Sequence, residues 1–194
     1  MTSSYSKGDA FEGRVFEALE SELREDRLCA IPRSAKIFRK KGYESRDRGS
    51  AVIVDISIEL FISGGTSPAI VWVSECKDYR GAIPVNDVEE FHSKLQHIGE
   101  DRTKGTLVTS GALQRSALAY AKAKGIGVIR LLPDDQIEII LHLMAAGSHD
   151  TDLSEFGVAL TDPAHRSERG FFASADGYWF GNWFSFLSHG LSLE

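Results

Sequence analysis

Residues 55–77 read DISIELFISGGTSPAIVWVSECK, two β-rich apolar runs separated by a turn cluster over residues 64–68. Glycine, serine and proline gathered between such runs are typical of the turn in a β-hairpin. Side chains alternate between the faces of a strand, so Glu75 and Lys77 share one side of the second strand. In the first strand, the same alternation predicts a face with Ile53, Asp55, Ser57 and Glu59 and an opposite face with Val52, Val54, Ile56, Ile58 and Leu60.

Asp55 is a carboxylate inside an apolar run. Removing a carboxylate from water without a partner costs several kcal/mol, so the charge needs a compensating cation. Lys77 could supply that charge, and a divalent metal ion could supply it equally well.

Composition makes this an ordinary globular chain. It has 194 residues, 42% of them hydrophobic and 26% charged, which predicts one domain with room for a second small unit. The net charge of −6 argues against indiscriminate coating of nucleic acid but permits a local basic groove. Cys29 and Cys76 lack the spacing of a zinc site or a disulfide framework, which predicts a reducing cytoplasmic location. Neither residues 1–9 nor residues 178–187 have the character of a signal peptide or a membrane span, so we expect no membrane partner.

A first helix is predicted from Ser6 or Asp9, as its cap, to about Arg24. Glu12 falls near the centre of its apolar stripe, which consists of Phe11, Val15, Phe16, Leu19 and Leu23. Two interpretations of Glu12 remain open. Either a salt bridge neutralises it at the edge of the stripe, or it reaches the same site as Asp55 and Glu75.

A basic segment precedes the hairpin. Residues 33–48 carry seven positive and two negative side chains, a local charge of +5. Such a patch could neutralise phosphates, and an edge strand protected by lysine and arginine is the alternative. The candidate nucleic-acid contacts are Arg39, Lys40, Lys41, Arg46 and Arg48.

Further elements follow the hairpin. Helical spacing and caps predict a helix from Asn86 or Asp87 to Ile98, and the later segments predict a strand over 105–110, a helix over 114–124, a strand over 127–132 and a helix over 136–146. Residues 147–168 are polar and turn-rich, as in a linker or surface excursion. Asp176-Gly177 between aromatic runs predicts a hairpin over 171–183. The expected organisation is a domain over 1–146 and a C-terminal extension over 147–194, packed on the core or at an oligomer contact.

The order of helix, hairpin with Asp55 and Glu75-Cys76-Lys77, helix, strand, helix and strand resembles the PD-(D/E)xK nuclease superfamily, and within it the Mrr-like restriction endonuclease catalytic domain. The resemblance covers about the first two thirds of the chain. It implies an α/β fold with a restriction endonuclease-like core, in which a central mixed β-sheet of about five strands is flanked by helices. Val54 replaces the proline of the family pattern, and Glu75 fills a position that is often glutamine in Mrr relatives.

The resemblance also implies the chemistry. Asp55, Glu75 and the Cys76 backbone carbonyl would bind Mg²⁺, with Mn²⁺ as a substitute, because Mg²⁺ prefers a few hard oxygen ligands plus waters. Lys77 would orient or deprotonate the attacking water. Glu12 would bind a second metal ion or its water. No small-molecule cofactor is expected.

Three functions follow from this pattern. The first is a metal-dependent DNA endonuclease of a restriction or defence system, expected to be a homodimer because two copies of one site can cut both strands of a duplex. The second is a non-cleaving nuclease-fold module that binds nucleic acid or a protein partner. The third is a structural domain in which Asp55 and Lys77 form a buried salt bridge.

Overall fold

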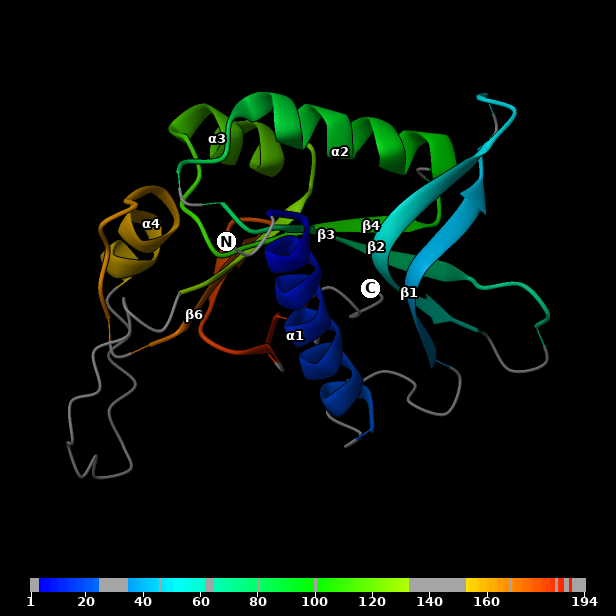
Figure 1. Ribbon diagram of the computed structural model, residues 1–194, viewed down its shortest axis with the longest axis horizontal. Coiled ribbons are helices and arrows are strands. Elements are labelled where there is room, and N and C mark those ends of the chain that lie inside the picture. The colour runs from blue at the N-terminus through cyan, green and yellow to red at the C-terminus, as the bar shows by residue number, and fades with distance from the viewer. Residues whose placement is uncertain are drawn as a thin grey trace.

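A computed structural model describes residues 4–24, 35–45, 47–61, 65–79, 81–99, 101–132, 153–167, 169–183, 185–186 and 189. Arg46 and the helix predicted over 136–146 lie outside the described residues. Figure 1 shows a central sheet with α2 and α3 along one side and α1 crossing the other.

The sheet is mixed and its seven strands are arranged in chain order, from β1 to β7. The β3–β4 and β4–β5 pairs are parallel, and the remaining neighbours are antiparallel. This confirms the predicted α/β class with a mixed sheet, but the predicted count of about five strands is wrong. The strands are β1 (Ala35–Glu44), β2 (Ala51–Leu60), β3 (Ile70–Lys77), β4 (Thr103–Thr109), β5 (Gly127–Leu131), β6 (Phe171–Ala175) and β7 (Tyr178–Phe180).

The two additional strands are the C-terminal aromatic hairpin. Asp176 and Gly177, with φ of 50° and 83°, form its turn, which confirms the hairpin predicted there. β6 pairs with β5, from Val128 opposite Ser174 to Leu131 opposite Phe171. The hairpin therefore extends the central sheet.

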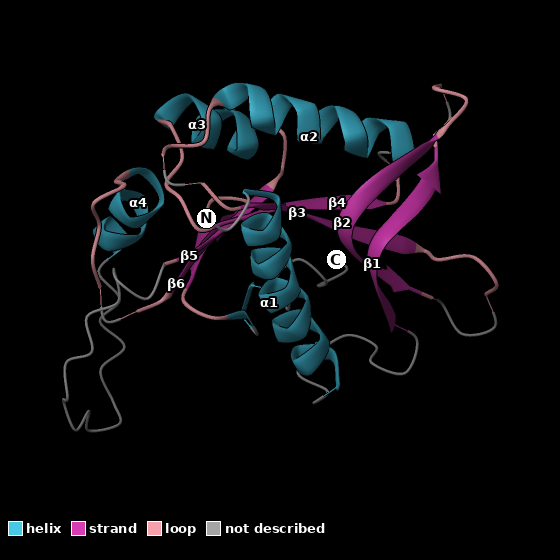
Figure 2. Cartoon of the chain, viewed as in Figure 1, coloured by secondary structure: helices cyan, strands magenta, loops and turns pink. Residues whose placement is uncertain are grey.

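Within the described ranges, four helices flank the sheet: α1 (Ser4–Arg24), α2 (Val85–Ile98), α3 (Arg115–Ala123) and α4 (Leu153–Thr161) (Figure 2). α2 and α3 are the crossovers that parallel neighbouring strands require. The predicted caps of α1, Ser6 and Asp9, lie inside the helix instead. The linker interpretation of residues 147–168 is wrong for Leu153–Thr161, because α4 buries an apolar face. Within the described ranges, no helix has the length and apolarity to cross a membrane.

Two hydrophobic clusters hold the helices to the sheet. Residues of α2, α3 and α4 form the first cluster with one face of the sheet, including Val71, Val73, Val88, Phe91, Leu107, Leu118, Val128, Phe156 and Phe172. Three buried residues of α1 and the C-terminal Phe186 form the second cluster with the other face, including Phe11, Val15, Leu19, Ile56, Ile58, Trp72, Val108 and Ile129.

β2 changes sides at Asp55. Val52 and Val54 belong to the first cluster, whereas Ile56, Ile58 and Leu60 belong to the second. The prediction that these five side chains share one face is therefore wrong. The change coincides with Lys40 on the neighbouring strand, whose φ of 53° departs from the extended conformation.

Candidate active site

Asp55 lies where β2 leaves β3. The ladder between the two strands runs from Leu60 opposite Ile70 to Ile56 opposite Ser74. Just beyond that last pair, the Asp55 carboxylate accepts a hydrogen bond of 2.8 Å from the backbone N–H of Cys76. The side chain thus satisfies a β3 donor beyond the ladder. This contact fixes Asp55 beside the residue that follows Glu75.

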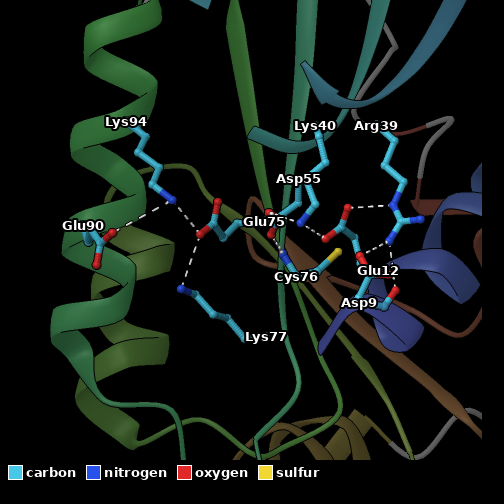
Figure 3. Close-up of polar contacts among 10 residues, drawn as sticks. All are labelled: Asp9, Glu12, Arg39, Lys40, Asp55, Glu75, Cys76, Lys77, Glu90 and Lys94. Atoms are coloured by element: carbon cyan, nitrogen blue, oxygen red, sulfur yellow. Dashed lines mark hydrogen bonds and ion pairs between the residues drawn. The ribbon is translucent and has the colours of Figure 1, made fainter. Parts of the chain in front are cut away.

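Glu75 is buried, at 4% exposure, and its two oxygens have different surroundings. Oε1 accepts a hydrogen bond of 2.7 Å from Lys94 Nζ and lies 3.3 Å from Lys77 Nζ. Oε2 is buried and has no hydrogen-bond partner among the residues that the structure describes. Figure 3 shows both lysines on the same side of the Glu75 carboxylate. Two ammonium groups therefore contact Oε1, whereas Oε2 is left for a further ligand.

Lys77 pairs with Glu75 in this arrangement, whereas the structural alternative pairs it with Asp55. Burial by itself lowers the pKa of Lys77, but the charge and hydrogen bond of Glu75, together with the charges of Asp87 and Glu90, raise the pKa above its ordinary value. In the absence of a metal ion, Lys77 is therefore an ammonium group that supplies positive charge.

Glu12 is buried at the contact of α1 with β1 and is 3% exposed. It accepts a hydrogen bond of 2.8 Å from Arg39 Nε and a further one from Lys40 Nζ. Arg39 also contacts Asp9 Oδ1 at 2.7 Å. Lys40 Nζ lies 3.7 Å from Asp55 Oδ1, so this lysine joins Glu12 to the rest of the site. The salt bridge, one of the two alternatives for Glu12, is present in the geometry, and the link from Glu12 to Asp55 runs through the Lys40 ammonium.

The basic side chains predicted to contact nucleic acid have different partners in the structure. Arg39 and Lys40 bind the acids of α1, while Lys41 Nζ is 2.5 Å from the buried Glu59. Arg48 is exposed in the turn after β1. Among the described members of the patch, three of the cations therefore already have acidic partners within the fold.

The residues present can be tested against the metal ion that the resemblance implies. Across the part of the chain that the structure describes, no three His, Cys, Asp or Glu side chains are grouped closely enough to hold a metal together. Mg²⁺ needs fewer, because it binds through one or two carboxylates and retains several waters. Asp55 and Glu75 have this donor chemistry, and the unpartnered Glu75 Oε2 is a carboxylate oxygen that lacks a ligand. The two acids fit one such ion.

Lys94 is the site residue that sequence reasoning missed. It lies on the polar face of α2, and its Nζ is 3.9 Å from the exposed Glu90 as well as 2.7 Å from Glu75. A lysine on a solvated helix face is ordinary, so spacing along the helix does not distinguish it. The packing of α2 over the end of β3 brings Lys94 to the buried acid.

A sequence model described as a restriction endonuclease, Mrr_cat, matches residues 33–140, which is more than half of the chain. The chain belongs to this restriction endonuclease family. The match confirms the resemblance drawn from the hairpin and, with the mixed sheet between helices, the restriction endonuclease-like core. Asp55, Glu75 and Lys77 lie within the matched residues, whereas α1 and Glu12 precede them.

Two solved structures are similar over part of the fold. One is AF1548, a protein of unknown function, with 13% identity, a TM-score of 0.41 and coverage of 56% of this chain and 55% of that chain. The other is a repair endonuclease from Pyrococcus abyssi, with 19% identity, a TM-score of 0.39 and coverage of 59% of this chain and 45% of that chain. The aligned part is thus about half of each solved chain. Comparison with curated proteins gives no match.

Proposed function

We propose that this protein is a metal-dependent endonuclease that hydrolyses phosphodiester bonds of DNA, with Mg²⁺ as its ion and Mn²⁺ as a substitute. The observation that supports this most is Glu75. It is buried and keeps one unpartnered oxygen, one residue away from the backbone N–H that anchors Asp55. A buried carboxylate oxygen without a partner is costly, and a bound cation would remove that cost.

Each residue would have a defined part. Asp55, Glu75 and the Cys76 carbonyl would hold the ion. When bound, Mg²⁺ would lower the pKa of a coordinated water and neutralise charge on the phosphate. The Lys77 ammonium would orient the attacking water and offset the negative charge that develops on the phosphoryl oxygens. Lys94 would keep Glu75 in position from the α2 side.

DNA as substrate, and a role in restriction or defence, rest on membership of the restriction endonuclease family. A homodimer would place two such sites on the two strands of a duplex. The DNA substrate, the restriction or defence role and the homodimer are all parts of this proposal.

Cleavage assays test the proposal directly. Supercoiled plasmid, linear duplex, single-stranded DNA and RNA would be incubated with wild type, Asp55→Asn, Lys77→Ala and the surface control Lys104→Ala, each with Mg²⁺, Mn²⁺ or EDTA. We expect metal-dependent nicking and linearisation of plasmid by wild type and Lys104→Ala, with a loss of at least about a hundredfold in the other two variants. Cleavage that survives EDTA or the loss of Lys77 would overturn the proposal.

The non-cleaving alternative is favoured by one observation. Glu12 and Glu75 are both paired with side-chain cations, and Asp55 accepts a backbone hydrogen bond and is ion-paired with Lys40. A module of this kind would bind DNA or a protein partner, and its melting temperature would not change with Mg²⁺ or Ca²⁺. A nuclease site would be stabilised by either ion through binding linkage.

A further inference from the structure

Lys40 has an unusual backbone conformation. Among the described residues, only Lys40 and Asp176 combine a side chain with a positive φ. Asp176 lies in a hairpin turn, where such a conformation is common. Lys40 lies within β1, away from any turn, and its φ of 53° is one that side-chain-bearing residues rarely adopt. Conformations of this kind persist where surrounding contacts hold them, and they gather at functional sites.

The contacts that hold Lys40 are carboxylates from two different elements. Its Nζ binds Glu12 Oε2 from α1 and lies 3.7 Å from Asp55 Oδ1 on β2. Asp55 Oδ2 is meanwhile bound to the Cys76 N–H. The ammonium group therefore lies between the two acids, as Figure 3 shows.

Two cations cannot share that position. An ammonium that is ion-paired with both carboxylates offsets part of their charge and fills the space between them that a second ion would need. The Glu75 side of the site is different, because its lysines gather on Oε1 and leave Oε2 unpartnered.

We propose that the Lys40 ammonium takes the place of a second metal ion between Glu12 and Asp55, so that each chain binds a single divalent ion, at Asp55 and Glu75. This inference rests on the proposed metal-dependent function. An ammonium has three N–H donors, and half of the Lys40 side chain is exposed. A donor is therefore left for a substrate phosphate oxygen, and Lys40 brings positive charge to the substrate without a second ion.

The test is the number of Mn²⁺ ions bound per chain, measured from the free Mn²⁺ signal by electron paramagnetic resonance. Lys40→Gly is the main variant, because glycine adopts a positive φ without strain, and Lys40→Met is the second. Lys40→Arg retains the charge, and Lys36→Met is a matched control on the same strand. Circular dichroism verifies that each variant is folded.

We expect one ion per chain for wild type, Lys40→Arg and Lys36→Met, and two for Lys40→Gly and Lys40→Met. One ion in every protein would overturn the role of Lys40 while leaving the proposed function standing. Two ions in wild type would also overturn it, because the position would then be open. No ion in wild type would overturn the proposed function and the inference together.

Discussion

Lys40 lies opposite Asp55 across the β1–β2 ladder, because the register pairs Arg39 with Ile56 and Lys41 with Val54. The Lys40 ammonium and the Asp55 carboxylate are 3.7 Å apart at their nearest atoms. The backbone distortion and the charge contact therefore occur at the same rung of the hairpin. This rung is also where β2 passes from one hydrophobic cluster to the other.

The strained φ of Lys40 predicts an inverted effect of glycine. Lys40→Gly and Lys40→Ala both remove the ammonium, but only glycine relieves the positive φ. We expect the glycine variant to be more stable than the alanine variant by about 1 kcal/mol, measured by urea unfolding. The same pair of substitutions at the exposed Lys36 of β1 is the control, and there glycine should be less stable by roughly 0.5–1 kcal/mol. Equal stabilities of the two Lys40 variants would show that no strain is present.

Glu12 binds two cations in a buried position, so its charge should stabilise the fold. We expect Glu12→Gln to lower the free energy of unfolding by about 1–2 kcal/mol, because charged hydrogen bonds are lost. The value stays modest since Arg39 and Lys40 are 34% and 50% exposed and can be hydrated. Glu20→Gln, which removes the exposed pair with Arg24, should cost less than about 0.5 kcal/mol. A Glu12 variant as stable as the Glu20 variant would contradict the importance of the buried pair.

The Cys76 thiol should react slowly. Burial raises the pKa of Cys76 well above its ordinary value, and the charges of Asp55, Glu12 and Glu75 add to the increase. A higher pKa means less thiolate at a given pH, and the thiolate is the reactive form. In a Cys29→Ala background, we expect alkylation by iodoacetamide at pH 8 to be at least about tenfold slower than for glutathione.

The same reaction has an internal control. Asp55→Asn removes one of the negative charges beside the thiol, so the rate should rise and its pH profile should move to lower pH. A profile centred near the ordinary cysteine pKa of about 8.5 in the unmodified site would contradict the expected shift.

Arg130 is buried at 1% exposure and joins α4 to the sheet. Its guanidinium donates to the Ala159 carbonyl, to the Asp162 carbonyl at 2.7 Å and to the Ser110 carbonyl at 3.4 Å. We expect Arg130→Met to reduce stability by about 2–4 kcal/mol in urea unfolding, because buried carbonyls lose their donors. The exposed Arg115→Met should change stability by less than about 0.5 kcal/mol. Similar losses for both variants would contradict a structural role for Arg130.

Local patterns predicted the elements whose signals lie within a few neighbouring residues. The glycine-rich turn before Pro68 and the alternation up to Lys77 predicted the hairpin, and the apolar stripe of the first helix indicated that Glu12 is buried. The strand count was underestimated because the pairing of β6 with β5 joins residues about 45 positions apart, as Ile129 opposite Ala173 illustrates. No local pattern reports such a pairing.

The lysines of the site illustrate the same limit. Lys40 reads as part of a solvated basic run, and nothing in its neighbours signals a positive φ, which usually accompanies glycine or asparagine. Lys94 reads as a solvated helix residue. Each finds its acid only when two elements pack together, α1 against β1 for Lys40 and α2 against β3 for Lys94. Arg130 differs from these lysines, because a cation among the Val and Ile residues of a buried strand is anomalous and can be recognised in the sequence.

The packing of α1 has a practical consequence for dividing this chain. A fragment cut to residues 33–140 would retain the family pattern but lack the helix that covers Ile56, Ile58 and Trp72. Burial of Phe11, Val15 and Leu19 would also be lost, each contributing about 1.5–3 kcal/mol. Such a fragment would expose an apolar face of the sheet and the unpaired edge of β5, and both features promote aggregation. The residues that match the family model are therefore fewer than the residues needed to cover both faces of the sheet.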